Sequence, residues 1–189
     1  MKNVVIFISG RGSNMAAILD EVDHGILHDI CRVSAVVSNR SDAAGLATAK
    51  EYGVETRVVE SSHINPDDYT ERLIAVTASY DPDLIVLAGY MKILHPAFIR
   101  AFEGRIVNIH PADTSLHQGL HAYEWAFDQG LDRTYITVHY VDEGVDTGAV
   151  IGKAEVDLRG ADTLEEVEKR GLAVEHCFYS RMLAKILQQ

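Results

Sequence analysis

The fold is decided by residues 4–14, which have the sequence VVIFISGRGSN. The first five of them form a continuous run of β-favouring apolar side chains, and residues 15–22 then carry apolar side chains at helical spacing. An apolar run without polar alternation is typical of a strand buried on both faces, as in a parallel sheet covered by helices. The stretch therefore predicts a buried strand, a glycine-rich turn and a helix.

The same order of strand and helix continues outward from this stretch. Further strands are expected at 33–37, 55–60, 84–88, 106–110, 135–141 and 150–158. Further helices are expected at 42–52 with Ser41 or Asp42 as the cap, at 66–80, and at 163–187 as one helix or two collinear pieces. The order predicts an α/β fold with a single doubly wound, mostly parallel sheet and helices on both faces.

Composition excludes several classes of function. The 189 residues include 17 basic and 28 acidic side chains, and the net charge of −11 disfavours nucleic acid as a partner. The only cysteines, Cys31 and Cys177, indicate a reducing compartment and argue against a cysteine-rich zinc site. No apolar run is long enough to span a membrane, so we expect a cytoplasmic protein. The first nineteen residues contain Lys2 and Arg11 but no acid, which sets them apart from the rest.

The turn at residues 10–14 is a candidate anion site. Unpaired backbone N–H groups and the positive end of the helix dipole point at such a turn, and Ser13 and Asn14 add side-chain donors. A dinucleotide is disfavoured because Met15 stands where its fingerprint needs a small residue, and Asn39 replaces the acid expected after the second strand. The turn predicts binding of a phosphate on a smaller ligand, and a simple tight turn with Ser13 as the helix cap remains the alternative.

A second polar cluster lies farther along the chain. Asn108 and His110 share one face at the end of a strand that Pro111 terminates, where ligands of open α/β sheets bind. An amide donor beside an imidazole is suited to stabilising an oxyanion and moving a proton. In the acidic turn 142–148, Asp146 is the best candidate to reach His110, orient its ring and raise its pKa. A structural histidine and a solvated acidic loop are the alternatives.

Two other reaction classes have weaker support. No G-x-S-x-G motif is present, so a serine hydrolase of the common α/β type is not indicated. His117 and His121 have metal-like spacing with Asp113 nearby, but Gly119 between them makes a shared helical face doubtful. A surface loop is the preferred interpretation, and we expect no metal.

Five motifs follow one another along nearly the whole chain. They are SGRGSN at 9–14, LAGYMKIL at 87–94, NIHP at 108–111, GLHA at 119–122 and VHYVDEGVDTG at 138–148. In combination they resemble the phosphoribosylglycinamide formyltransferase family. The resemblance implies a Rossmann-like formyltransferase fold. It also implies transfer of a formyl group from 10-formyltetrahydrofolate, as co-substrate, to the amino group of glycinamide ribonucleotide in de novo purine biosynthesis.

The resemblance also implies roles for particular residues. The expected catalytic residues are Asn108, His110 and Asp146, and the expected phosphate-binding residues are Gly12, Ser13 and Asn14. The expected folate-binding residues are Met91, Lys92, Ile93, Leu94 and Asn108, and Glu175 matches the acid at the amine end of the substrate. One domain is expected over 1–189, with 1–105 as the phosphate-binding half and 106–189 as the catalytic and folate-facing half.

The chain also departs from the family pattern. Ala112-Asp113-Thr114-Ser115 follows the NIHP motif where Ser-Leu-Leu-Pro is usual, and Tyr123 and Trp125 replace smaller or more polar residues. A hydrolase of 10-formyltetrahydrofolate, a formyltransferase acting on another amine, and a non-catalytic phosphoribosyl-ligand binder remain alternatives. The sequence leaves open a homodimer, the preference for polyglutamated folate and closure of the loops around 111–121 and 142–148.

Overall fold

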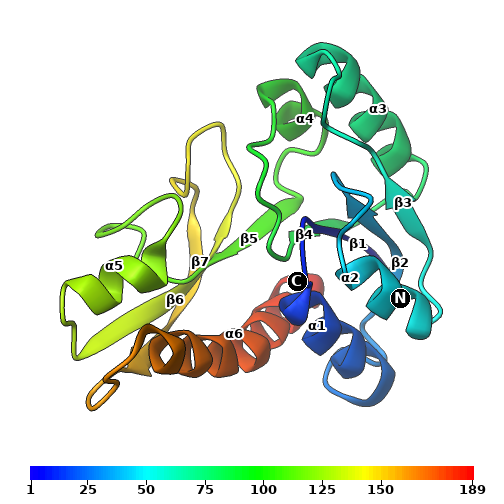
Figure 1. Cartoon of the computed structure of the whole chain (residues 1–189). Helices are drawn as coiled ribbons and strands as arrows, with labels where there is room; N and C mark the ends of the chain where they lie inside the picture. The colour runs from blue at the N-terminus through cyan, green and yellow to red at the C-terminus, as the bar shows by residue number, and fades with distance from the viewer.

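The computed structural model describes all residues, 1–189, and contains one seven-stranded sheet of order β3-β2-β1-β4-β5-β6-β7 (Figure 1). The strands are β1 (Lys2–Ile8), β2 (Cys31–Ser38), β3 (Thr56–Val58), β4 (Leu84–Leu87), β5 (Ile106–His110), β6 (Arg133–Tyr140) and β7 (Val150–Asp157). The helices are α1 (Ser13–His24), α2 (Gly45–Glu51), α3 (Pro66–Ala78), α4 (Pro96–Ala101), α5 (Ala122–Asp128) and α6 (Leu164–Leu187).

Strands β1 to β5 pair in parallel, whereas β6 and β7 join the sheet antiparallel. Helices α1 and α6 cover one face of the sheet, and α3 and α4 cover the other (Figure 1). The predicted doubly wound, mostly parallel sheet with helices on both faces is confirmed.

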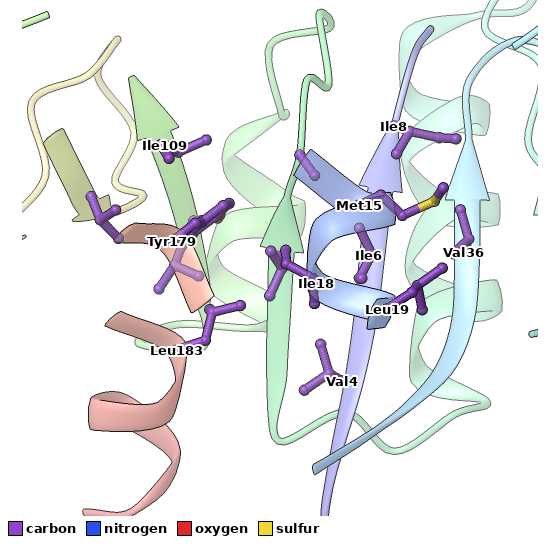
Figure 2. Close-up of a cluster of buried hydrophobic side chains, with 14 of the residues drawn as sticks. Val4, Ile6, Ile8, Met15, Ile18, Leu19, Val36, Ile109, Tyr179 and Leu183 are labelled. Carbon is purple, nitrogen blue, oxygen red and sulfur yellow. The ribbon is translucent and has the colours of Figure 1, made fainter. Parts of the chain in front are cut away.

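Strand β1 is the centre of the core because both of its faces are covered. Val4, Ile6 and Ile8 pack with Met15 and other residues of α1 in a cluster of 26 buried side chains (Figure 2). The side chains between them, including Phe7, point to the opposite face and join a second cluster of 13. Full burial of such a side chain contributes about 1.5–3 kcal/mol, so this strand anchors both layers.

Some local features differ from the sequence expectations. Helix α2 begins at Gly45 after Ala44 and has no side-chain cap, because the Asp42 carboxylate instead accepts hydrogen bonds from Arg40 at 2.8 and 2.9 Å. The expected cap at Ser41 or Asp42 is therefore wrong. Helix α6 runs without a break through Gly171 over 24 residues, and its cap is Thr163.

The sequence did not predict the short helices α4 and α5. They have six and seven residues, too few for a helical apolar period to stand out. None of the helices combines the length and apolar character needed to cross a bilayer.

The topology brings several loops to one edge of the sheet. Strands β1, β4 and β5 are parallel neighbours, so their carboxyl ends, at Ile8, Leu87 and His110, lie along the same edge. Ligands of open α/β sheets bind in crevices outside these ends. Gly12 and Met91–Leu94 lie in the loops after β1 and β4, and Asn108 and His110 lie in β5 itself.

Candidate active site

The structure brings Asn108, His110 and Asp146 together at the end of β5. The Asp146 Oδ2 atom lies 3.3 Å from His110 Nδ1, and Asn108 Nδ2 donates to Asp146 Oδ1 at 3.4 Å. Asn108 and His110 come from one strand, whereas Asp146 comes from the loop between β6 and β7. The amide of Asn108 has a second N–H, which this contact leaves free.

Asp146 is held from further directions. The Gly119 backbone N–H donates to its Oδ2 at 2.8 Å, and His139 Nε2 lies 3.3 Å from its Oδ1. Its backbone is left-handed, with φ of 53°. Burial raises the pKa of Asp146, but the approach of His139, the Gly119 bond and the charge of His110 outweigh it and lower that pKa.

Sequence reasoning did not select His139. It lies directly opposite Asn108 in the antiparallel β5–β6 pair, so it shares the face on which Asn108 and His110 lie. Period-two alternation in both strands could have found it, but only once their register was known.

Burial controls the titration of His110, which is 4% exposed. Its Nε2 lies 3.0 Å from the His117 carbonyl oxygen, so both ring nitrogens face an acceptor. Burial nevertheless lowers the pKa of His110, and it outweighs the opposing effects of Asp146 and the carbonyl. The expectation of a raised pKa is therefore wrong, because a carboxylate on one side does not compensate for loss of water around the ring.

A cavity of about 370 Å³ opens beside these three side chains. Asn108, His110 and Asp146 form one part of its wall, and the segment Met91–Leu94 forms another. Met91 and Ile93 are 65% and 76% exposed, so this wall presents apolar side chains to a ligand. An apolar cavity with a few convergent polar groups is the usual form of a small-molecule site.

Ser9 ties the apolar wall to the sheet, a link that sequence reasoning missed. The backbone N–H of Met91 donates to Ser9 Oγ at 2.9 Å, and Ser9 Oγ donates to Asn39 Oδ1 at 2.6 Å. Ser9 and Asn39 are both buried. Buried polar groups joined in this way hold a loop in one position.

The glycine turn does not contain the helix cap that one interpretation of the sequence expected at Ser13. Gly12 precedes α1 with φ of 71°, a left-handed conformation that favours glycine, and no side chain caps the helix. Ser13 is exposed and is not the cap. Asn14 is buried, and its Nδ2 donates to Glu175 Oε2 at 2.5 Å. Ser13 is therefore open to solvent, whereas the Asn14 amide faces inward.

Glu175 is 5% exposed at the junction of three helices. Its second carboxylate oxygen accepts a hydrogen bond from the Tyr123 hydroxyl of α5. Burial raises the pKa of Glu175, against the lowering effects of Tyr123, Asn14 and His176. Glu175 and the glycine turn are thus in contact with each other, but they do not line the cavity beside His110.

The side chains considered as metal ligands point to separate partners. The His117 ring stacks on His110 with centroids 6.1 Å apart and lies 5.0 Å from Trp125. His121 pairs with Glu124 at 3.1 Å, and Asp113 pairs with Lys153 at 2.6 Å. No group of three histidine, cysteine, aspartate or glutamate side chains is arranged to hold a metal ion.

Comparison with known proteins agrees with this arrangement. The family model for formyl transferase matches residues 2–183. Phosphoribosylglycinamide formyltransferase of Escherichia coli is 36% identical over 183 residues, which cover 96% of this chain and 85% of that protein. The crystal structure of glycinamide ribonucleotide transformylase 1 from Symbiobacterium toebii superposes with a TM-score of 0.93 at 35% identity, covering 100% of this chain and 88% of the other.

A phosphoribosylglycinamide formyltransferase from Brucella melitensis is similarly close. Its crystal structure has a TM-score of 0.91 and 37% identity, covering 100% of this chain and 96% of that one. Both the sequence and the fold therefore match along almost the full length, and this chain belongs to the formyl transferase family.

Proposed function

We propose that this protein transfers the formyl group of 10-formyltetrahydrofolate to the amino group of glycinamide ribonucleotide in de novo purine biosynthesis. The observation that carries the proposal is the placement of Asn108, His110 and Asp146 in one wall of an apolar cavity. Relatives that carry this activity in their names match nearly the full length of the chain. We take the chain as one domain over 1–189.

The cavity suits the folate. Its apolar wall at Met91, Ile93 and Leu94 offers a surface for a flat heterocycle, and the half-buried Lys92 adds a positive charge beside it. Asn108 borders the same space and can donate to the formyl oxygen. A folate bound in this way brings its formyl carbon to the polar side chains of residues 106–189, which we propose as the catalytic half.

The phosphate end of the ribonucleotide belongs to the half 1–105. The backbone N–H groups at Gly12 and Ser13 open α1, which has 12 residues, and its positive end favours an anion. The nearest carboxylate, Glu175, would lie toward the donor groups of the substrate. Asn14 contributes through Glu175, because its amide is turned inward.

The chemistry follows from these positions. The lone pair of the glycyl amine forms a bond to the formyl carbon, and the electrons of the C=O bond move onto oxygen. The free N–H of Asn108 and the Nε2–H of His110 donate to this oxyanion. To do so, the His110 Nε2–H gives up its hydrogen bond to the His117 carbonyl oxygen. Preorganised donors of this kind are worth on the order of 10² to 10³ in turnover each.

Proton transfer completes the reaction. Burial keeps the pKa of His110 low before reaction, and the developing negative charge then raises the affinity of the ring for a proton. The proton lost by the attacking nitrogen passes through a bridging water to the leaving nitrogen of the folate, while His110 keeps its Nε2–H on the oxyanion. The C–N bond to the folate breaks as the carbonyl reforms, which leaves the formylated amide and tetrahydrofolate. Asp146 orients the ring and stabilises its charged form.

The decisive experiment measures loss of the formyl group from 10-formyltetrahydrofolate with and without glycinamide ribonucleotide. Release that requires the ribonucleotide, with formylated ribonucleotide as product, supports the proposal. Release without any amine would instead indicate the hydrolase, and activity only with another amine would indicate a sister formyltransferase. The absence of turnover under all conditions would favour a non-catalytic binder.

We also propose a cytoplasmic location, which the free thiols of Cys31 and Cys177 support. A homodimer remains a prediction that sedimentation velocity can test.

A further inference from the structure

Glu175, the acid expected at the amine end of the substrate, makes a contact that the proposed mechanism does not use. Tyr123 of α5 donates its hydroxyl hydrogen to Glu175 Oε1, while Asn14 of α1 donates to Oε2. Each oxygen of this buried carboxylate thus has one donor, and the two donors come from different helices. Tyr123 is also one of the positions at which the sequence departs from the family pattern.

Gly171 of α6 provides the space that Tyr123 occupies. A Cβ atom at Gly171 would lie 2.2 Å from Cε1 and Oη of Tyr123 and 2.3 Å from its Cζ. Real Cβ atoms do not approach ring atoms so closely, and the obstructing atoms include the middle of a partly buried ring. A glycine inside a helix is otherwise unfavourable relative to alanine. The two residues therefore form a matched pair, in which the missing side chain of Gly171 makes room for the ring of Tyr123.

Acceptor atoms around Glu175 remain without donors. Asn14 Oδ1 is buried and has no partner, and the carboxylate keeps further lone pairs on both oxygens. A buried acceptor without a partner is costly, which favours a ligand that brings donors. Ammonium, amine and hydroxyl groups of an aminated ribonucleotide have this chemistry.

We infer that Tyr123 is a positioning residue for binding of the amine substrate: seated on Gly171, it holds Glu175 so that the carboxylate faces the donor groups of the ribonucleotide. The inference rests on the proposed function. Tyr123 acts through Glu175 and does not line the cavity next to His110, so its effect is confined to one of the two substrates.

The first test is Tyr123→Phe, which keeps the ring over Gly171 and removes only the hydroxyl. We expect KM for glycinamide ribonucleotide to rise about tenfold, while KM for 10-formyltetrahydrofolate changes less than about twofold. Tyr135→Phe is the matched control, because Tyr135 is also a tyrosine whose hydroxyl donates to a glutamate, Glu155, at 3.4 Å on the surface. The control should leave both KM values unchanged.

The pH profile provides a readout that a purely structural role would not move. The groups facing Glu175 are Tyr123 from α5, Asn14 from α1, and His176 and Tyr179 from α6 itself. Because the Tyr123 bond lowers the pKa of Glu175, its removal should move the acidic limb of kcat/KM for the ribonucleotide to higher pH. The profile for the folate should not shift.

The second test is a double-mutant cycle on Tm. Gly171→Ala should lower Tm in the wild-type background because of the clash, but raise it in a Tyr123→Ala background, where only helix propensity acts. Additive effects would refute the matched pair. If the wild-type protein is active but Tyr123→Phe leaves KM for the ribonucleotide unchanged, the inference is refuted and the proposed function stands. The same holds if Tyr123→Phe changes KM for both substrates equally. A wild-type protein that does not formylate the ribonucleotide would refute the proposed function and this inference with it.

Discussion

Replacing Asp146 by asparagine removes a negative charge that lies 3.3 Å from His110 and keeps the size of the side chain. The backbone tolerates the change, because asparagine readily adopts the left-handed conformation found at this position, where φ is 53°. The Gly119 N–H can only donate, so the new amide oxygen stays at the Oδ2 position, 2.8 Å from that nitrogen. The new NH₂ group then faces Asn108 Nδ2, which is itself a donor, and that hydrogen bond is lost.

The magnitude follows from the charge. Two unit charges about 4 Å apart interact by about 4 kcal/mol at an effective dielectric near 20, and each ~1.4 kcal/mol is a factor of ten. Partial exposure to water reduces this energy. Loss of the charge should therefore destabilise the His110 imidazolium enough to lower turnover by about two to three powers of ten. We therefore expect kcat of Asp146→Asn to fall by about 10² to 10³, in line with the loss of one preorganised transition-state contact.

The assay measures kcat with both substrates saturating, alongside urea unfolding to show that the variant is folded. Asp157→Asn is the matched control, because this carboxylate is exposed, pairs with Arg159 and lies at the end of β7. It should retain wild-type kcat. Near-normal turnover by a folded Asp146→Asn protein would show that the charge is not required and would refute the reasoning.

Three further predictions concern the surroundings of the site. Lys153→Met should lower kcat by about tenfold with little change in either KM. The reason is that the Lys153–Asp113 pair, 2.6 Å apart, anchors the loop whose His117 carbonyl contacts His110. Steady-state kinetics test this, and an unchanged kcat would contradict it. Because the pKa of His110 is lowered in the folded protein, the unfolded chain binds more protons, so stability should decrease as pH falls below about 6.5. Urea unfolding of wild type and His110→Gln between pH 7.5 and 5 checks this, and equal slopes would exclude His110 as the source. Ser9→Ala should raise KM for the folate about fivefold and leave KM for the ribonucleotide unchanged, because the Met91 backbone N–H loses its acceptor. An unchanged folate KM would argue against this link.

Much of the fold could be predicted because its signals are local. The apolar run at 4–8 and the repeated order of strand and helix predicted the parallel sheet, and Pro66 marked the start of α3 correctly. The start of α2 was misjudged because Asp42 had two uses: it can cap a helix, or it can pair with Arg40, as it does in the structure. Nothing in the spacing distinguishes these choices, because the outcome depends on where the neighbouring loop lies.

For the candidate site, the sequence by itself determined which residues share a face and where a chain turn meets a helix. Period-two alternation placed Asn108 and His110 together, and the pattern of glycines located the turn before α1. Tertiary structure alone decided the contacts of His139 with Asp146 and of Tyr123 with Glu175, along with the depth of burial that lowers the pKa of His110. The physical reason is that periodicity reports the geometry of one segment. The partner of a side chain, and the water it loses, depend on segments that meet only when the chain folds.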